Sequence, residues 1–306
     1  MTNVQEMGLV GVLYGGNSSE REVSLEAGAA VYRALINQGV HAELIDTAQD
    51  GAIDALISKI DRAMIMLHGR GGEDGAIQGL LKTLGIPYSG SRVSACALAM
   101  DKWRSKLIFE GCGVPTPKFS LIQTVEELVT AMDDLGLPLV VKPSREGSTI
   151  GITKITQRQD AKAAFDLARK FDETVIAEQF IDGDELKVAV LNGQPLPVVR
   201  IVAPNNNYDY QAKYHSEETR YFCPSGLDSS VDRNIQDVAM RAFEALGCSG
   251  WGRVDVMRDQ AGGPWVLEVN TVPGMTGHSL VPMAALESGL TFEQLVLEIL
   301  RGCDVA

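Results

Sequence analysis

The first hundred residues alternate between short apolar runs and longer amphipathic segments. Three of the apolar runs are typical of β-strands, at 8–16, 41–46 and 62–69. An amphipathic segment at 18–40 joins the first two. Strands joined by helices at this spacing pair in parallel, so the sequence predicts an N-terminal open α/β domain with a parallel sheet. Ligands of such sheets bind where the strands end, here near 15–20 and 68–75.

The predicted helix at 18–40 starts with two serines. Ser18 or Ser19 is expected to cap its first turn, and with Ser19 as the cap Glu22 completes a capping box. The preceding loop, "YGGNSSER", does not fit GxGxxG, so this domain is not expected to bind a dinucleotide.

The character of the chain changes after a helix that begins near Asp101 and is broken by Pro115 and Pro117. The following residues alternate between strands, a loop that holds Gly147 and Gly151, and an amphipathic helix, which predicts a small α+β unit. The remainder contains strands, a long polar loop at 203–225, a helix at 234–247, a hairpin and a terminal helix.

The hairpin consists of "RVDVM" and "WVLEVN", separated by the turn-rich "RDQAGGP". The register that sets Asp255 opposite Glu268 also sets Arg253 opposite Asn270. In this register one face of the hairpin is wholly apolar and consists of Val254, Val256, Trp265, Leu267 and Val269. A slip of one residue would lose this sorting, so we expect the apolar face to pack on a core.

The opposite face of the hairpin places two carboxylates side by side. At roughly 4 Å they repel by about 4 kcal/mol at an effective dielectric near 20. Either one carboxyl is protonated or a cation lies between them. Asp255, Glu268 and Asn270 offer only oxygen ligands, which suit Mg²⁺ or Mn²⁺. The alternative is a solvated strand face on which Arg253 neutralises Asp255, and the hairpin alone does not decide.

Three lysines from separate segments could contact phosphates: Lys102, Lys142 and Lys213. Lys142 ends an apolar strand just before the loop that holds Gly147, where backbone N–H groups could approach a phosphate. The chain has no GxxxxGK[ST] motif, so it is not a P-loop protein. Taken alone, Lys102 and Lys213 are more typical of ordinary surface residues. Lys142 is the exception, because "PLVVKP" places it at the end of a strand expected to be buried.

Composition restricts the class of protein. The formal net charge is -13, which argues against a nucleic-acid partner. No apolar run approaches the ~20 residues that cross a bilayer, and "MTNVQEMG" lacks the features of a signal peptide. The 5 cysteines are scattered without a CxxC pair, which predicts reduced thiols in a cytoplasmic protein.

Seven stretches match the pattern of one family in that family's order. They are "GGNSSEREVSL", "LHGRGGEDGAIQGLL", "MDKWRSK", "VKPSREGSTIG", "YDYQAKY", "GWGRVDVM" and "LEVNTVPGMTGHSLVPMAA". On these residues the chain resembles the bacterial D-alanine–D-alanine ligases of the ATP-grasp superfamily. The resemblance implies an N-terminal domain at 1–101 with the first D-alanine site and a central ATP-grasp lid at 102–182. It also implies a C-terminal domain at 183–306 with the metal and second substrate sites.

The resemblance also implies a reaction. One D-alanine carboxylate takes the γ-phosphate of ATP and becomes an acyl phosphate. The amine of a second D-alanine then attacks, and phosphate leaves from a tetrahedral intermediate. The product would be the dipeptide of peptidoglycan precursors, made by a homodimer in the cytoplasm.

The same resemblance implies roles for individual residues. Asp255, Glu268 and Asn270 match magnesium ligands, with Glu268 bridging two Mg²⁺ or Mn²⁺ ions. Arg253 and the backbone N–H of Gly274 match the groups that stabilise the intermediate. The matching nucleotide contacts are Lys102, Lys142 and Lys213 at the phosphates, Glu178, Phe180 and Ile181 around the base, and Glu185 at the ribose.

Substrate contacts are implied in the same way. Glu20 matches the acid that holds the ammonium group of the first D-alanine, and His68 a further substrate contact. Ser279 and Leu280 match the pocket of the second carboxylate. The residues Glu20, Ser148 and Tyr214 match a hydrogen-bonded set that joins the three domains.

Several alternatives remain open on the sequence. Glu20 could merely favour a helix N-terminus, and Ser148 and Tyr214 could be simple loop residues. The second substrate could be D-lactate or D-serine, although Tyr214 favours the dipeptide because relatives that make the ester usually have Phe there. A catalytically silent nucleotide-binding protein would keep the same fold. The loop at 203–225 is expected to close over the site and exclude water.

Overall fold

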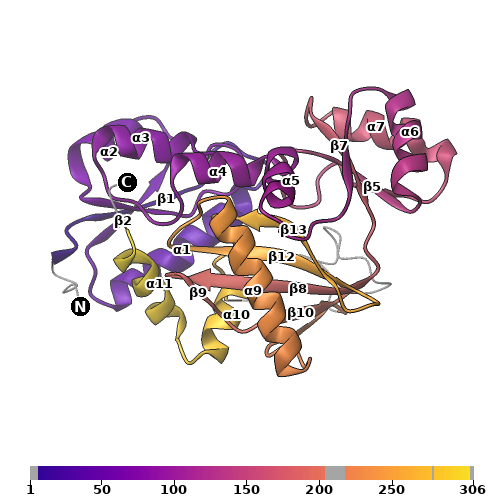
Figure 1. Cartoon of the computed structure of the whole chain (residues 1–306). Helices are drawn as coiled ribbons and strands as arrows, with labels where there is room; N and C mark the ends of the chain where they lie inside the picture. Colours follow the sequence, from indigo (N-terminus) through magenta and orange to yellow (C-terminus); the bar gives the residue numbers. More distant parts are fainter. Residues whose placement is uncertain (1–5, 204–217, 278, 304–306) are drawn as a thin grey trace.

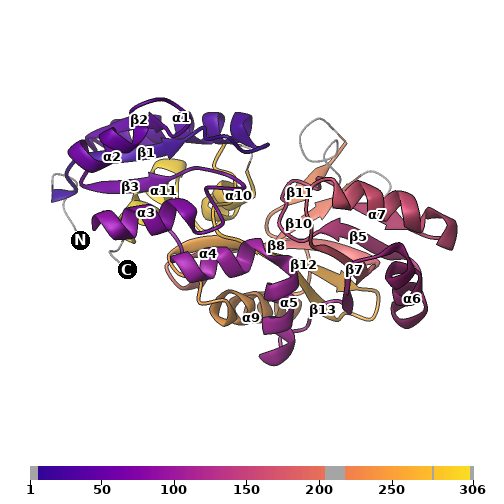
Figure 2. The same ribbon diagram turned by 90° about the horizontal axis from the view of Figure 1, so that it is seen from above.

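The computed structural model describes residues 6–203, 218–277 and 279–303 (Figure 1). These residues form three β-sheets with helices packed on them, which confirms the predicted combination of α/β and α+β units. The largest sheet lies between a lobe built on β1–β3 and a lobe built on β4–β7 (Figure 2).

The first sheet is parallel, as predicted, with strand order β2–β1–β3. Its strands are β1 (Val10–Tyr14), β2 (Ala42–Asp46) and β3 (Arg62–Ile65). The helices of this part of the chain are α1 (Arg21–Asn37), α2 (Ala52–Lys59), α3 (Ala76–Leu84) and α4 (Val93–Met100). Gly28 lets α1 approach β1 closely, because a Cβ there would lie 2.4 Å from the Cβ of Tyr14.

The predicted cap of the first helix is wrong. α1 begins at Arg21, after Glu20, and no side chain caps it, so neither Ser18 nor Ser19 has that role. The hydroxyl of Ser18 donates instead to the carbonyl of His68 at 2.6 Å. This bond joins the loops that follow β1 and β3, and therefore fixes the edge of the sheet where a ligand was expected.

The second sheet is antiparallel, in the order β4–β7–β5–β6. Its strands are β4 (Phe119–Ile122), β5 (Leu139–Pro143), β6 (Thr153–Ile155) and β7 (Val175–Gln179), with α6 (Val125–Leu135) and α7 (Ala161–Arg169). These elements share one core. The helix before them, α5 (Lys102–Gly111), is capped by Asp101, but its Phe109 packs in the core of the third sheet.

The third sheet has the order β11–β10–β8–β12–β13, with β9 paired to β8. Its strands are β8 (Gly183–Leu191), β9 (Gln194–Pro195), β10 (Val199–Val202), β11 (Arg220–Phe222), β12 (Trp251–Asp259) and β13 (Pro264–Asn270). α9 (Ser229–Ala245) packs on it (Figure 1). The predicted register is confirmed: Asp255 lies opposite Glu268, and Arg253 opposite Asn270.

The predicted apolar face of the hairpin is partly wrong. A bulge follows Asp255, so that Val256 pairs with Val266 rather than with Leu267. The extra residue in β13 reverses the sides on which its side chains point. Val266 is therefore buried with Val254, Val256 and Val269, whereas Trp265 and Leu267 are only partly buried. The indole of Trp265 instead donates to Asp259 at 2.7 Å.

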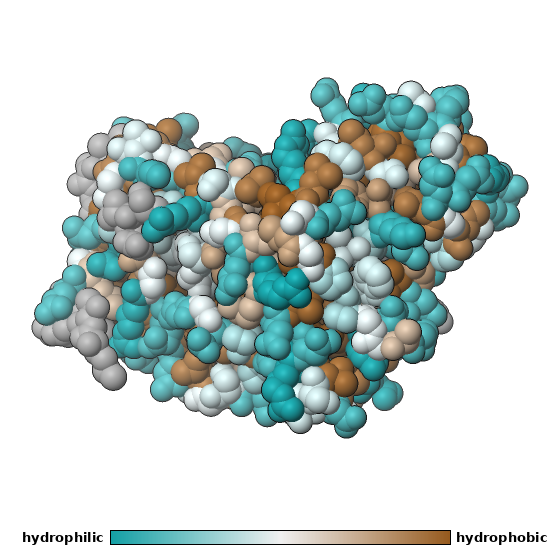
Figure 3. All heavy atoms as spheres, viewed as in Figure 1, coloured by the Kyte–Doolittle hydropathy of each residue, from teal (hydrophilic) through white to brown (hydrophobic). Residues whose placement is uncertain are grey.

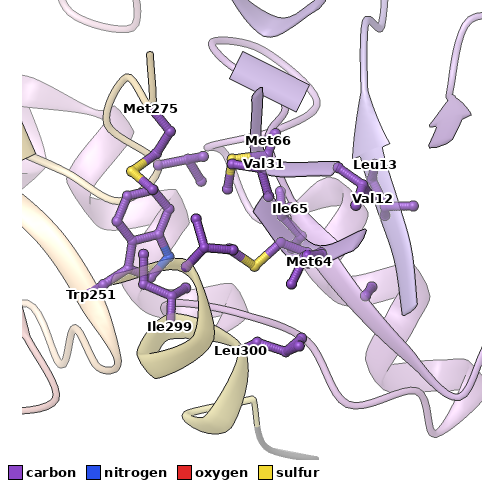
Figure 4. Close-up of a cluster of buried hydrophobic side chains, with 14 of the residues drawn as sticks. Val12, Leu13, Val31, Met64, Ile65, Met66, Trp251, Met275, Ile299 and Leu300 are labelled. Carbon is purple, nitrogen blue, oxygen red and sulfur yellow. The ribbon is translucent and has the colours of Figure 1, made fainter. Parts of the chain in front are cut away.

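The last two helices, α10 (Leu280–Glu287) and α11 (Phe292–Arg301), complete the core of the first sheet. Ile299 and Leu300 of α11 lie in one apolar cluster with Met64 and Val12, and Trp251 of β12 joins them (Figure 4). The two ends of the chain thus share one core, and the third sheet is anchored to the first through it.

Within the described ranges, no single helix combines the length and apolar composition needed to span a bilayer. α10 and α11 meet those criteria only as a pair, and the pair is bent by 101°. Hydrophilic residues cover most of the face seen in Figure 3, with hydrophobic areas scattered among them.

A buried lysine of α5 connects β7 of the second sheet to β13 of the third sheet. Lys106 of α5 is fully buried, with its Nζ 2.5 Å from Oε2 of Glu178 and 2.7 Å from the hydroxyl of Thr116. The Thr116 hydroxyl donates in turn to the carbonyl of Val266 at 2.8 Å. Burial lowers the pKa of Lys106 to about 8, although the Glu178 carboxylate favours its charge.

We expect Lys106→Met to lower the free energy of unfolding by on the order of 3 kcal/mol, because Glu178 loses a buried counter-charge. Urea unfolding followed by circular dichroism measures this loss. The exposed pair of Lys162 and Asp166 on α7 offers a matched control, and Lys162→Met should cost less than about 1 kcal/mol. The double variant Lys106→Met/Glu178→Gln should regain part of the stability; a double variant that is no more stable than Lys106→Met would contradict the pairing.

Candidate functional site

A cavity of about 320 Å³ opens where the three sheets meet. Its walls come from the loops after β1 and β3, the loop between β5 and β6, the facing strands β12 and β13, and the segment at 272–280. It therefore lies at the strand ends where the sequence predicted a ligand. The predicted site residues in its lining are Glu20, His68, Ser148, Arg253, Asp255, Glu268, Asn270, Gly274, Ser279 and Leu280.

Glu20 and the loop after β5 form one wall of the cavity. The hydroxyl of Ser148 donates to Oε1 of Glu20. A Cβ on Gly147 would lie 2.8 Å from Oε2 of the same carboxylate. Ser148 and Thr149 have φ angles of 50° and 64°, in the left-handed region that non-glycine residues rarely adopt. A strained loop without a side chain at 147 thus brings the second sheet against the first.

A neutral histidine lies beside this wall. His68 is 5% exposed, and its Nδ1 is 2.8 Å from the carbonyl of Val272, to which it must donate. Burial lowers the pKa of His68, so its other nitrogen is an acceptor, and that nitrogen has no partner among the described residues. Burial, together with the charge of Glu20, raises the pKa of the nearby Glu73 carboxyl to about 8. Both groups are therefore uncharged near pH 7.

The polar face of the hairpin supplies its own counter-charges. Arg253 donates to Asp255 through Nε at 2.7 Å and Nη2 at 3.1 Å. Lys187 of β8 lies on the other side, with Nζ 2.7 Å from Oδ2 of Asp255. Burial acts against the charge of Asp255, but the two cations hold its pKa well below the usual range. The pairing of Arg253 with Asp255 is thus present, but on a buried face rather than a solvated one, because Asp255 is 3% exposed.

Glu268 has a different partner. Its Oε2 lies 3.0 Å from Nζ of Lys102, and the same ammonium group donates to the carbonyl of Glu146 at 2.7 Å. Burial disfavours the charge of Lys102, but the carboxylate of Glu268 outweighs it and raises the Lys102 pKa. Lys102 therefore links the hairpin to the loop that contacts Glu20.

The residues of this face fit a divalent cation. Asp255, Glu268 and Asn270 all line the cavity and offer only oxygen ligands. The Nδ2 atom of Asn270 is buried without a hydrogen-bond partner among the described residues. No hydrogen bond from this atom to a described residue therefore prevents the amide from turning its oxygen toward a metal ion. The described part of the chain holds no metal-type cluster of three His, Cys, Asp or Glu residues, so the fit depends on this mixed set.

Six predicted nucleotide contacts are not among the residues that line this cavity: Lys102, Lys142, Glu178, Phe180, Ile181 and Glu185. Lys142 pairs with Oε1 of Glu178 at 3.1 Å. Burial opposes the charge of Glu178, but Lys106 and Lys142 hold its pKa below the usual value. Ile181 is buried, and the ammonium group of Lys154 lies 3.4 Å from the ring centroid of Phe180. The Glu178 carboxylate thus lies between two buried lysines, Lys106 and Lys142.

Residues 272–274, 276, 279 and 280 form another part of the cavity lining. Ser279 directly precedes α10, and its hydroxyl accepts from the backbone N–H of Thr276 at 3.0 Å. A Cβ on Gly274 would lie 3.0 Å from that hydroxyl, so the backbone of Gly274 runs close to it. Leu280 opens α10, whose first N–H groups have no partner within the helix. The wall therefore offers backbone donors to an anion.

Two predicted residues cannot be placed in this geometry. Lys213 and Tyr214 lie outside the described residues, as does most of the loop predicted at 203–225. Their roles remain predictions, and so does the hydrogen-bonded set of three that includes Tyr214.

Sequence reasoning missed Lys187 and Glu73, both of which line the cavity. In "DELKVAVL" Lys187 alternates with Glu185 on one face of a strand, which indicates a shared surface. Only the pairing of β8 with β12 sets Lys187 opposite Asp255, and no local pattern predicts that order of strands. Glu73 lies in "LHGRGGEDG", where the composition suggests a polar loop and gives no sign of its burial.

Comparison with known proteins agrees with this geometry. Residues 108–301 match the sequence family described as D-ala D-ala ligase C-terminus, and residues 49–91 match D-ala D-ala ligase N-terminus. A D-alanine–D-alanine ligase of Pseudomonas entomophila is 52% identical over 298 residues, which cover 97% of this chain and 94% of that protein.

Two solved structures are similar over nearly the whole chain. The D-alanine–D-alanine ligase of Bacillus anthracis complexed with ATP superposes with a TM-score of 0.84 at 31% identity, covering 96% of this chain and 97% of that one. The VanG D-Ala:D-Ser ligase of Enterococcus faecalis gives a TM-score of 0.82 at 30% identity, covering 96% and 98%. These matches confirm the predicted ATP-grasp architecture. With half of its residues shared with the Pseudomonas ligase and both family regions matched, the chain belongs to the D-alanine–D-alanine ligase family.

Proposed function

We propose that the protein joins two D-alanine molecules into D-alanyl-D-alanine and converts ATP to ADP and phosphate. The observation that carries this proposal is the single cavity in which Glu20, Arg253, Glu268 and Ser279 line facing walls. It offers a carboxylate for an ammonium group, an oxygen-rich face for a metal, and backbone donors for a carboxylate. Membership of the ligase family supports the same reaction.

The first D-alanine binds with its ammonium group at Glu20. Ser148 holds Oε1 of that carboxylate, and Gly147 leaves room beside Oε2. The neutral His68 adds an acceptor nitrogen near the same place. The substrate carboxylate then points toward the hairpin, where it attacks the γ-phosphorus of ATP and becomes an acyl phosphate as ADP departs.

Asp255, Glu268 and Asn270 would hold Mg²⁺ or Mn²⁺. A divalent ion at this face neutralises the charge that develops on the transferred phosphoryl group. Lys102 and Lys142 supply fixed positive charges for the phosphates, since each is buried at its ion pair. Glu178, kept ionised by two lysines, can accept a hydrogen bond from an amino group of the base but cannot donate one.

The second D-alanine binds at the wall formed by 272–280. Its carboxylate accepts from the N-terminus of α10 at Ser279 and Leu280. Its free amine attacks the carbonyl carbon of the acyl phosphate, and the C–N bond forms as the carbonyl oxygen takes up negative charge. Arg253 and the N–H of Gly274 stabilise this oxyanion, after which the bond from carbon to the phosphate oxygen breaks and the departing phosphate takes up the amine proton.

The proposed product is a building block of peptidoglycan precursors. We infer that the protein acts in the cytoplasm as a homodimer, in line with the family resemblance. All five cysteines lie in the described residues as free thiols, which supports a reducing compartment.

Phosphate release in the presence of ATP and Mg²⁺ should depend on D-alanine, and the dipeptide should appear in equal amount. A coupled phosphate assay and chromatography measure both products. Limiting D-alanine supplied with excess D-serine or D-lactate tests the acceptor, and D-alanine should be preferred. Phosphate release that D-alanine does not increase would rule out the ligase reaction and favour a silent nucleotide-binding protein.

Glu268→Gln should abolish turnover, because the amide cannot supply the charge that holds the metal or pairs with Lys102. We expect at least a loss of about 1000-fold in kcat, since a charge-stabilising group of the transition state is removed. The circular dichroism spectrum should not change. Glu43→Gln on β2, far from the cavity lining, is a matched control. Retained activity in Glu268→Gln would contradict the assignment of this residue to the metal site.

Ser148→Ala should raise KM for D-alanine by about tenfold, because a hydrogen bond to a charged group contributes about 1.5–3 kcal/mol. Steady-state kinetics at saturating ATP measure the change. The effect should disappear when Glu20 is already replaced by Gln, since the hydroxyl acts through that carboxylate. Equal effects of Ser148→Ala in both backgrounds would show that the serine has some other role.

A further inference from the structure

The most unusual feature of the metal-binding face is a cation that already occupies it. Lys187 lies directly opposite Asp255 in the ladder between β8 and β12. Its Nζ is 2.7 Å from Oδ2 of Asp255 and 2.8 Å from Oε1 of Glu185. The side chain is 3% exposed, so water screens these contacts little.

Both oxygens of Asp255 are engaged by cationic side chains. Oδ1 accepts from Nε of Arg253, and Oδ2 accepts from Lys187 and from Nη2 of Arg253. A divalent ion that binds Asp255 must displace one of these donors or approach an already neutralised carboxylate.

Among the described residues, each carboxylate of this face has a cation beside it. Asp255, Glu185 and Glu268 contribute three negative charges, and the matching cations are Arg253, Lys187 and Lys102. Glu268 pairs through Oε2 with Lys102, which reaches it from the side of α5. The Nδ2 atom of the neighbouring Asn270 has no hydrogen-bond partner among the described residues.

We propose that Lys187 is a resident cation that sets the affinity of this face for divalent ions. It weakens binding at Asp255 and leaves Glu268 and Asn270 as the side chains that hold an ion most tightly. The inference rests on the proposed function only in taking this face as the metal site. Of the two ions that the family resemblance implies, the one at Asp255 is then bound more weakly, because Lys187 and Arg253 hold both oxygens of that carboxylate.

The test is a titration with Mn²⁺ alone, in which the electron paramagnetic resonance signal of free Mn²⁺ gives Kd. Lys187→Met keeps the length of the side chain and removes its charge. It should bind Mn²⁺ about tenfold more tightly than the wild type, because a positive charge next to a ligand carboxylate repels a divalent ion. Lys187→Arg keeps the charge and should bind as weakly as the wild type. Unchanged or weaker Mn²⁺ binding by Lys187→Met would overturn the proposal.

A second comparison leaves Lys187 in place and therefore does not depend on how its variants fold. Asp255→Asn should weaken Mn²⁺ binding less than Glu268→Gln does, because Lys187 and Arg253 already hold both oxygens of Asp255, whereas Glu268→Gln should weaken binding by about tenfold or more. Equal losses in the two variants would overturn the proposal, and so would the absence of Mn²⁺ binding in every protein. Phosphate release with D-alanine, measured on the same wild-type sample, tests the ligase reaction separately.

Discussion

The antiparallel ladder of β8, β12 and β13 is the constraint on which the site depends. Its register sets Lys187 opposite Asp255 and Asp255 opposite Glu268, so three strands present their charges in one row. Such a row is stable only because each carboxylate has a buried cation beside it. The apolar side of the same ladder packs on α9 and α5, which holds the row in place. The chemistry of the site therefore follows from strand pairing as much as from the residues themselves.

Different parts of the fold contribute different kinds of group to the site around this row of charges. The strand ends of the first sheet give Glu20 and His68, fixed by the bond from Ser18 to the carbonyl of His68. The second sheet extends a loop whose left-handed residues reach Glu20. The start of α10 gives the backbone N–H groups of Leu280 and Val281, which have no acceptor within the helix. A reaction with a phosphoryl donor and two amino acids needs all three kinds of group, and no single sheet of this fold provides them.

Local patterns predicted those parts of the structure that depend on neighbouring residues. Alternation fixed the strands of the first sheet, and the sorting of charge fixed the register of Asp255 with Glu268. The predictions failed where a contact with a residue distant in the sequence determined the local structure. Ser18 was expected to cap a helix but bonds to His68, 50 residues away. The bulge after Asp255 exchanged Leu267 for Val266 in the core. Lys187 was missed because its partner lies 68 residues later. The roles of the individual site residues were predicted from the family resemblance. The distances between residues of different sheets cannot be predicted from any single stretch of the sequence.

The shared core of the first sheet and α11 has a consequence for how the chain is made. Leu295, Val296 and Leu300 fill space against strands that leave the ribosome more than two hundred residues earlier. Until α11 has been synthesised, the nascent first sheet lacks these apolar partners and exposes the surface they will cover. A chain that stopped before α11 would carry that uncovered surface into solution, where exposed apolar surface promotes aggregation. Folding of the first sheet therefore depends on a helix that is made more than two hundred residues after its strands.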